Sequence, residues 1–142
     1  MPVYQHILAA VEFDENSTKV LQGAAAMAQL CEADLCVLHV VSYPVVTDID
    51  FEAPSLYELE STLVKLAKKH LQELLTKAAL SNHVRTIVTT GRPKDEIANT
   101  AEKEKTDLIV IGAHGRHGLD KLLGSTANRV LTHAPCNVLV VH

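Results

Sequence analysis

Glycine and hydroxyl residues gather in the last third of the chain, at a spacing suited to binding phosphate. Gly112 and Gly115 follow the apolar run Ile109 to Ile111, and eight residues separate Gly115 from Gly124-Ser-Thr126. Glycine lets the backbone approach a ligand closely, and the start of a helix adds unpaired N–H donors with partial positive charge. The segment from Gly112 to Thr126 is therefore a candidate phosphate-binding loop.

A helix break is predicted inside this segment. Apolar residues from Leu119 to Leu131 would permit one continuous helix, but Gly124 in its interior would cost about 1 kcal/mol relative to alanine. We expect the last helix to start at Gly124 or Ser125, beside the Gly112 to Gly115 turn. In an alternative that stays open, the glycines only shape a tight turn and Ser125 caps the helix. The segment matches neither a P-loop nor the strict dinucleotide fingerprint.

Other side chains within the segment could contribute different chemistry. His114 could donate to phosphate, with Arg116 and Lys121 supplying positive charge. His114 and His117 stand three residues apart, but no cysteine or second histidine pair completes a four-ligand metal set. No nucleophile, base and orienting acid can be assembled, and Ser125 does not lie in a Gly-x-Ser-x-Gly elbow. A regulatory phosphate ligand is favoured over a substrate, with slow hydrolysis of that ligand at most.

Strand and helix patterns alternate along the chain and must position this segment. Strands are predicted at His6 to Val11, Leu35 to Val41, Val84 to Thr90, Asp107 to Gly112 and Cys136 to Val141. Helices are predicted from Ser17 to Cys31, from Ser55 to about Ala79, from Pro93 onward and from Gly124 or Ser125 onward. The run from Ser42 to Pro54 has no regular period and is predicted to be a mobile loop.

This alternation predicts an α/β fold in a single domain over residues 1–142. Strands joined by helices favour a parallel sheet with right-handed crossovers, between two helical layers in a three-layer α/β/α sandwich. The polar run from Val84 to Thr90 is expected near a sheet edge. In such sheets, ligands bind beyond the carboxyl ends of the strands, where the strand order reverses.

Histidines and cysteines inside apolar runs are interpreted mainly as core residues. His39 is expected to be a hydrogen-bonded core histidine rather than a base, and no partner can be assigned to His70. Cys31, Cys36 and Cys136 form no CxxC pair and are expected to be small buried apolar groups in a reducing compartment.

Composition excludes several classes of protein. The 142 residues are 47% hydrophobic and carry a net charge of −4, so the basic surface needed to bind nucleic acid is lacking. No window approaches the roughly 20 apolar residues of a membrane span, and the N-terminus does not resemble a signal peptide. We therefore expect a cytoplasmic protein without a nucleic-acid or membrane partner.

Several motifs together resemble the universal stress protein family over essentially the whole chain. They are Ile7-Leu-Ala-Ala-Val-Glu12, Leu38-His-Val40, Gly91-Arg-Pro93, Gly112-Ala-His-Gly115 with Gly124-Ser-Thr126, and Ala134-Pro-Cys-Asn-Val-Leu-Val-Val141. The resemblance implies an adenine nucleotide alpha hydrolase-like fold with strand order 3-2-1-4-5, usually as a homodimer in the bacterial cytoplasm. Some members bind ATP, for which Mg or Mn is the expected companion ion, and others do not.

The resemblance also implies a set of nucleotide-binding residues. In the binders, a Gly-x2-Gly-x9-Gly-Ser/Thr motif wraps the phosphates, an acid after the first strand meets the nucleoside, and the residue after the second-strand histidine contacts adenine through its backbone. Matched by position, the set is Ala10, Glu12, Val40, Ile111, Gly112, His114, Gly115, Arg116, Gly124, Ser125 and Thr126.

Two departures from the family pattern bear on ATP. Eight residues rather than nine separate Gly115 from Gly124, so the second glycine cluster could be displaced by a few ångströms. Glu12 stands where aspartate is usual, which adds one methylene. Two functions stay open: a nucleotide-binding stress-response module, and a non-nucleotide-binding dimeric interaction protein acting through its dimer surface and the 42–54 loop.

The C-terminal strand suggests how a dimer would form. If Val138 to Val141 is an outermost strand, its free edge needs cover, and nothing in the chain follows His142. Pairing with a second copy would cover it, so a homodimer through residues 136–142 is expected. In the alternative, neighbouring side chains protect the edge.

Overall fold

Five strands and four helices alternate in the computed structural model, which describes residues 3–42, 53–81, 83–113 and 124–142. The strands are β1 (His6–Ala10), β2 (Asp34–Val41), β3 (Arg85–Thr90), β4 (Leu108–Gly112) and β5 (Asn137–Val141). The helices are α1 (Ser17–Cys31), α2 (Ala53–Lys77), α3 (Pro93–Lys103) and α4 (Ser125–His133). Each predicted element is present, with ends that differ from prediction by no more than two residues.

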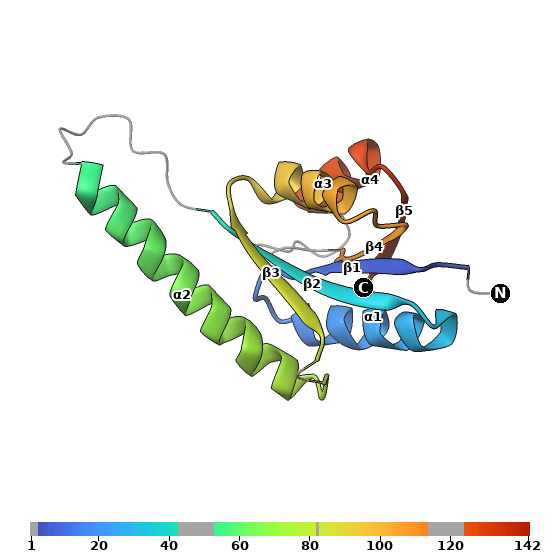
Figure 1. The fold of residues 1–142 in the computed structure, drawn as a ribbon. Helices are drawn as coiled ribbons and strands as arrows, with labels where there is room; N and C mark the ends of the chain where they lie inside the picture. Colours follow the sequence, from blue (N-terminus) through green and yellow to red (C-terminus); the bar gives the residue numbers. More distant parts are fainter. Residues whose placement is uncertain (1–2, 43–52, 82, 114–123) are drawn as a thin grey trace.

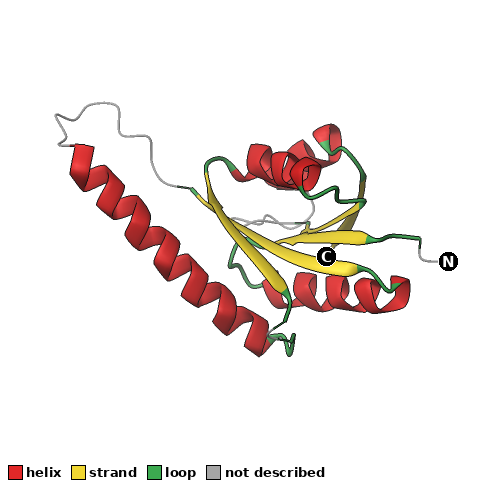
Figure 2. Ribbon diagram, in the orientation of Figure 1, coloured by secondary structure: helices red, strands yellow, loops and turns green. Residues whose placement is uncertain are grey.

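All five strands are parallel and lie in the order β3-β2-β1-β4-β5, which confirms the predicted topology. The polar strand β3 lies at one edge, as expected, and β5 lies at the other. Helices α1 and α2 lie on one side of the sheet and α3 and α4 on the other (Figures 1 and 2). No helix among the described residues is both long enough and apolar enough to cross a membrane.

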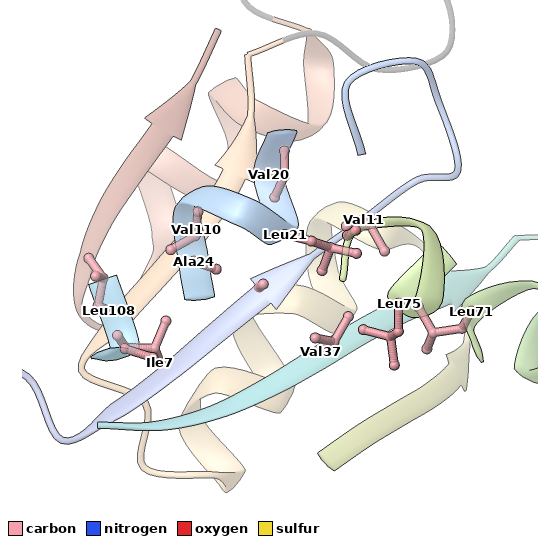
Figure 3. Close-up of a cluster of buried hydrophobic side chains, with 13 residues drawn as sticks. Ile7, Val11, Val20, Leu21, Ala24, Val37, Leu71, Leu75, Leu108 and Val110 are labelled. Atoms are coloured by element: carbon pink, nitrogen blue, oxygen red, sulfur yellow. The ribbon is translucent and has the colours of Figure 1, made fainter. Parts of the chain in front are cut away.

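Both faces of the sheet are buried, which explains the nearly continuous apolar strands. Ile7 and Ala9 of β1, with Val11 just after its end, pack toward α1 and α2, in the cluster shown in Figure 3. Leu8 and Ala10 pack into a second cluster with residues of α3 and α4. Because side chains alternate along a strand, one short apolar run supplies both cores.

The ends of α1 agree with prediction, whereas α2 starts earlier than expected. Asp14 Oδ1 accepts hydrogen bonds from the Asn16 N–H and the Ser17 hydroxyl, at 3.0 and 3.1 Å, just before α1 begins. Helix α2 begins at Ala53 rather than Ser55. Pro54 was interpreted as part of a loop, but proline is also compatible with the first turn of a helix. Residues 43–52, which make up most of the predicted loop, lie outside the described residues.

The three cysteines are free thiols with unequal burial. Cys31 is buried as expected, whereas Cys36 and Cys136 are half-buried. Burial raises the pKa of Cys36 from 9.0 to about 11, and the positive charge of Arg85 opposes this shift. At neutral pH the Cys36 side chain is therefore a neutral thiol.

Alkylation of Cys36 should consequently be slow at neutral pH. Because the thiolate is the reactive form, the rate should rise about tenfold per pH unit and level off only near pH 11. Iodoacetamide labelling followed by peptide mass spectrometry measures this profile. The same thiol in urea-unfolded protein should level off near its ordinary pKa of 9.0, and a folded-state plateau at that pH would contradict the assigned burial effect.

Candidate functional site

A crevice opens where β1 and β4 end and α4 begins. Five of the predicted site residues line it, namely Ala10, Glu12, Ile111, Gly112 and Thr126. The other lining residues are Val11, Asp14, Ser17, Val20, Ile97 and Ala127. The parallel topology accounts for this grouping, because the carboxyl ends of adjacent strands β1 and β4 lie at the same edge of the sheet.

Backbone hydrogen bonds bring the second glycine cluster to the end of β4. The Ala113 N–H donates to the Val141 carbonyl at 2.8 Å, and the Gly124 N–H donates to the Ala113 carbonyl at 2.9 Å. Gly124 therefore lies beside Ala113, directly after Gly112, although the intervening segment is one residue shorter than in the family motif. Residues 114–123, between these two ends, lie outside the described residues.

Helix α4 starts at Ser125, which confirms the predicted break at Gly124. Its N-cap residue is Gly124, in an extended conformation, and no side chain makes a cap hydrogen bond. Ser125 is therefore the first helical residue and not the cap that the ligand-free alternative assumed. The N–H groups of the first turn have no partner within a helix, so they are available to an anion.

The crevice itself is narrow. Its cavity volume is about 20 Å³, far below the roughly 300–1,000 Å³ of typical small-molecule pockets. The described residues around the crevice therefore have room for a small part of a ligand, such as one polar group.

A larger cavity of about 540 Å³ adjoins the crevice and shares Thr126 with it. It is lined by Ser42, Gly91, Arg92, Pro93, Lys94, Ser125 and Thr126. Both α3 and α4 begin at this cavity, and two lining residues are cationic. This combination of helix starts and positive charge is suited to an anion.

Sequence reasoning did not assign Arg92 and Lys94 to the site. The Gly91-Arg-Pro93 turn was noted, but the positive charge that follows β3 was not connected with the glycine loop. Gly91 has a φ of +139°, and a Cβ there would come within 2.9 Å of the Glu96 side chain, so the turn requires glycine. The position of Arg92 and Lys94 directly after a predicted parallel strand could have assigned them to the site, because ligands bind beyond the carboxyl ends of parallel strands.

Glu12 is half-buried in the turn between β1 and α1. Immediately before it, the Val11 N–H donates to the Leu38 carbonyl at 3.0 Å, and the Val11 carbonyl lies 2.8 Å from His39 Nδ1. A carbonyl can only accept, so His39 carries a hydrogen on Nδ1. His39 is 6% exposed, which confirms the predicted hydrogen-bonded core histidine.

Immediately after Glu12, Phe13 lies between two histidine rings. Its ring centroid is 3.7 Å from that of His39 and 4.3 Å from that of His70, with interplanar angles of 19° and 24°. Stacked aromatic pairs each contribute about 0.5–1.5 kcal/mol beyond burial. The stack joins strand β2, the turn after β1 and helix α2, and it gives His70 the partner that the sequence did not reveal.

Val40 lies near the crevice without lining it. It is 7% exposed and packs in the same cluster as Ala10 and Ile111. Its register partner on β3 is Thr89, whose hydroxyl oxygen is buried and has no hydrogen-bond partner among the described residues. A buried polar atom without a partner is unfavourable, so within the described part of the chain Thr89 is an exception to the usual pairing of buried polar groups.

The remaining predicted residues cannot be placed, and no metal centre is found in the described part of the chain. His114, Gly115 and Arg116, with His117 and Lys121, lie outside the described residues, so their roles stay predictions. Across residues 3–42, 53–81, 83–113 and 124–142, no three His, Cys, Asp or Glu side chains lie close enough to hold a metal ion.

Comparisons with known proteins agree over the full length of the chain. The family model for the universal stress protein family matches residues 3–142. Universal stress protein A homolog 1 of Coxiella burnetii is 42% identical over 139 residues, which are 97% of this chain and 96% of that protein. The structure of universal stress protein UspA from Lactobacillus plantarum has a TM-score of 0.82 at 30% identity, covering 98% of both chains. A universal stress protein solved in complex with cAMP shares the fold, with a TM-score of 0.64, 22% identity and coverage of 98% and 97%.

Proposed function

The chain belongs to the universal stress protein family, and on that premise we propose that it is a stress-response module that binds ATP or a related adenine nucleotide as a regulatory ligand. One observation carries the proposal. The Gly124 N–H donates to the Ala113 carbonyl at 2.9 Å, so the start of α4 lies next to the end of β4, and this supports a phosphate site there. Glu12 and Thr126 line the same crevice.

The phosphates would lie at the start of α4. The first-turn N–H groups of Ser125 and Thr126 supply donors, and Arg92 and Lys94 supply positive charge from the adjoining cavity. Gly112 and Gly115 would let the backbone approach the phosphates, with His114 and Arg116 as further donors. A Mg or Mn ion would be held mainly by the phosphates, as is usual for Mg bound with a nucleotide.

The nucleoside would lie toward β1 and β2. Glu12 can accept hydrogen bonds from ribose hydroxyls, and the backbone at Val40 would contact adenine, with Ala10 and Ile111 forming the apolar floor. The longer glutamate side chain gives Glu12 more reach than the usual aspartate.

The proposal includes a cytoplasmic homodimer and no rapid turnover. Strand β5 is an edge strand, so a second copy could pair with its free side. The second candidate function is a non-nucleotide-binding dimeric interaction protein of the same fold. The small volume of the crevice, about 20 Å³, is the observation that favours it.

Calorimetric titration of the purified protein distinguishes the two functions. With Mg²⁺ present, ATP should give saturable heat below millimolar concentration, and native mass spectrometry of protein purified without added nucleotide should detect a bound adenine nucleotide. A related protein was solved with cAMP, so cAMP is titrated in parallel. No bound nucleotide and no heat from either ligand would exclude the nucleotide-binding function and leave the interaction protein.

A further inference from the structure

Phe13 has a backbone conformation that large side chains rarely adopt. Its φ is +58°, in the left-handed region. The other non-glycine residues with positive φ in the described part of the chain are Glu32, Ala79 and Lys105, which each follow a helix. A left-handed residue is ordinary at a helix end, but Phe13 precedes a helix instead. The surrounding contacts must therefore hold Phe13 in place.

The Phe13 side chain points away from the crevice. Glu12 and Asp14 both line the crevice, whereas Phe13 does not, and its ring lies between those of His39 and His70. The left-handed conformation thus places consecutive side chains on two sides of the turn. The ring meets the sheet and α2, and the Glu12 carboxylate is left at the ligand-binding edge.

Every neighbour of Glu12 in the chain is fixed by a specific contact. Val11 is held by hydrogen bonds to the Leu38 carbonyl and to the His39 ring, and Phe13 by the ring stack. The Asp14 N–H donates to the Ser17 hydroxyl at 3.1 Å. Of these contacts, the stack is the one that reaches α2.

We propose that Phe13 is a positioning residue that presents Glu12 to the nucleoside part of a bound nucleotide. The His39 and His70 rings clamp the Phe13 ring between them and so hold this turn in place. This inference rests on the proposed nucleotide function and deepens it. It assigns the ring stack to recognition of the nucleoside, while the start of α4 and the Arg92 and Lys94 side chains serve the phosphates. Disrupting the stack should then weaken binding of ATP without affecting binding of inorganic triphosphate.

Phe13→Gly is the main test variant, because glycine adopts a positive φ without strain and so removes the ring without adding backbone strain. ATP affinity measured by calorimetry should fall about tenfold, as for the loss of one hydrogen bond to a charged group. Affinity for inorganic triphosphate should stay within twofold of the wild-type value. Phe13→Tyr retains an aromatic ring and should restore most of the ATP affinity.

A double-mutant cycle tests whether Phe13 acts through Glu12. Glu12→Gln alone should weaken ATP binding, and adding Phe13→Gly should then cause little further loss, because the carboxylate that Phe13 positions is already gone. If the fold-loss of ATP affinity in the double variant equals the product of the two single-variant losses, the two residues act independently and the inference is overturned.

His70→Ala provides a variant that spares the core, since His70 is exposed on α2, and Lys69→Ala on the same helix is its control. His70→Ala should weaken ATP binding several-fold, and Lys69→Ala should not.

Proton NMR gives a readout without nucleotide, because loss of the Phe13 ring current should shift the ring protons of His39 and His70. Unshifted ring protons in Phe13→Gly, or equal ATP affinity in His70→Ala and wild type, would refute the clamp. Wild-type protein that binds neither ATP nor triphosphate would instead refute the nucleotide function itself, and the inference with it.

Discussion

Replacing Gly115 with valine is expected to abolish ATP binding while leaving the fold intact. Gly115 is the second glycine of the proposed phosphate-binding motif, where the branched side chain of valine would occupy the approach of the phosphates. Affinity should fall at least about a hundredfold, equivalent to about 2.7 kcal/mol. Calorimetric titration with ATP and Mg²⁺ measures the loss.

Gly23→Ala is the matched control for glycine substitution. Gly23 lies within α1, and a Cβ there would meet the Val141 side chain at 3.5 Å, an ordinary contact distance. This variant should bind ATP as the wild type does. Thermal unfolding followed by circular dichroism should show that Gly115→Val remains folded. If folded Gly115→Val binds ATP with wild-type affinity, the glycine loop serves only the turn.

The elements of this fold could be predicted because their signals are local. Helix α1 was predicted from Ser17 to Cys31 and has those bounds, since helical periodicity and polar residues at its start coincide. The helix break at Gly124 follows from the intrinsic cost of glycine within a helix. The order of strands required more than periodicity and came from the family resemblance.

The contacts around Glu12 could not be predicted, because they depend on how distant segments meet. Phe13 and His70 are far apart in the sequence, and neither periodicity nor spacing relates a loop phenylalanine to a histidine on a later helix. The positive φ of Phe13 could not be predicted from the sequence either, because this conformation is expected mainly at glycine and asparagine. The positive charges of Arg92 and Lys94 are evident in the sequence, but their position beside the start of α4 could not be predicted from it.

Val140→Pro should convert the proposed dimer into monomers, because it removes an outward-facing hydrogen-bond donor from the edge of β5. The Val141 carbonyl accepts from the Ala113 N–H, so it faces β4. Backbone groups alternate in direction along a strand, so the N–H of Val140 faces away from β4. Proline there keeps the pairing with β4 and is tolerated on an edge strand. In a two-fold symmetric dimer, each substitution acts twice.

Loss of two hydrogen bonds at about 1 kcal/mol each should weaken the dimer roughly thirtyfold, before any steric effect of the proline ring. Sedimentation velocity over a range of protein concentrations measures the change. Val140→Ala is the control, because it shortens the side chain but keeps the N–H, and it should remain dimeric. A Val140→Pro protein that dimerises as the wild type does would place the interface on another surface, whereas a monomeric wild type would leave the β5 edge unpaired. The comparison of the two variants therefore separates backbone pairing at β5 from side-chain packing as the source of assembly.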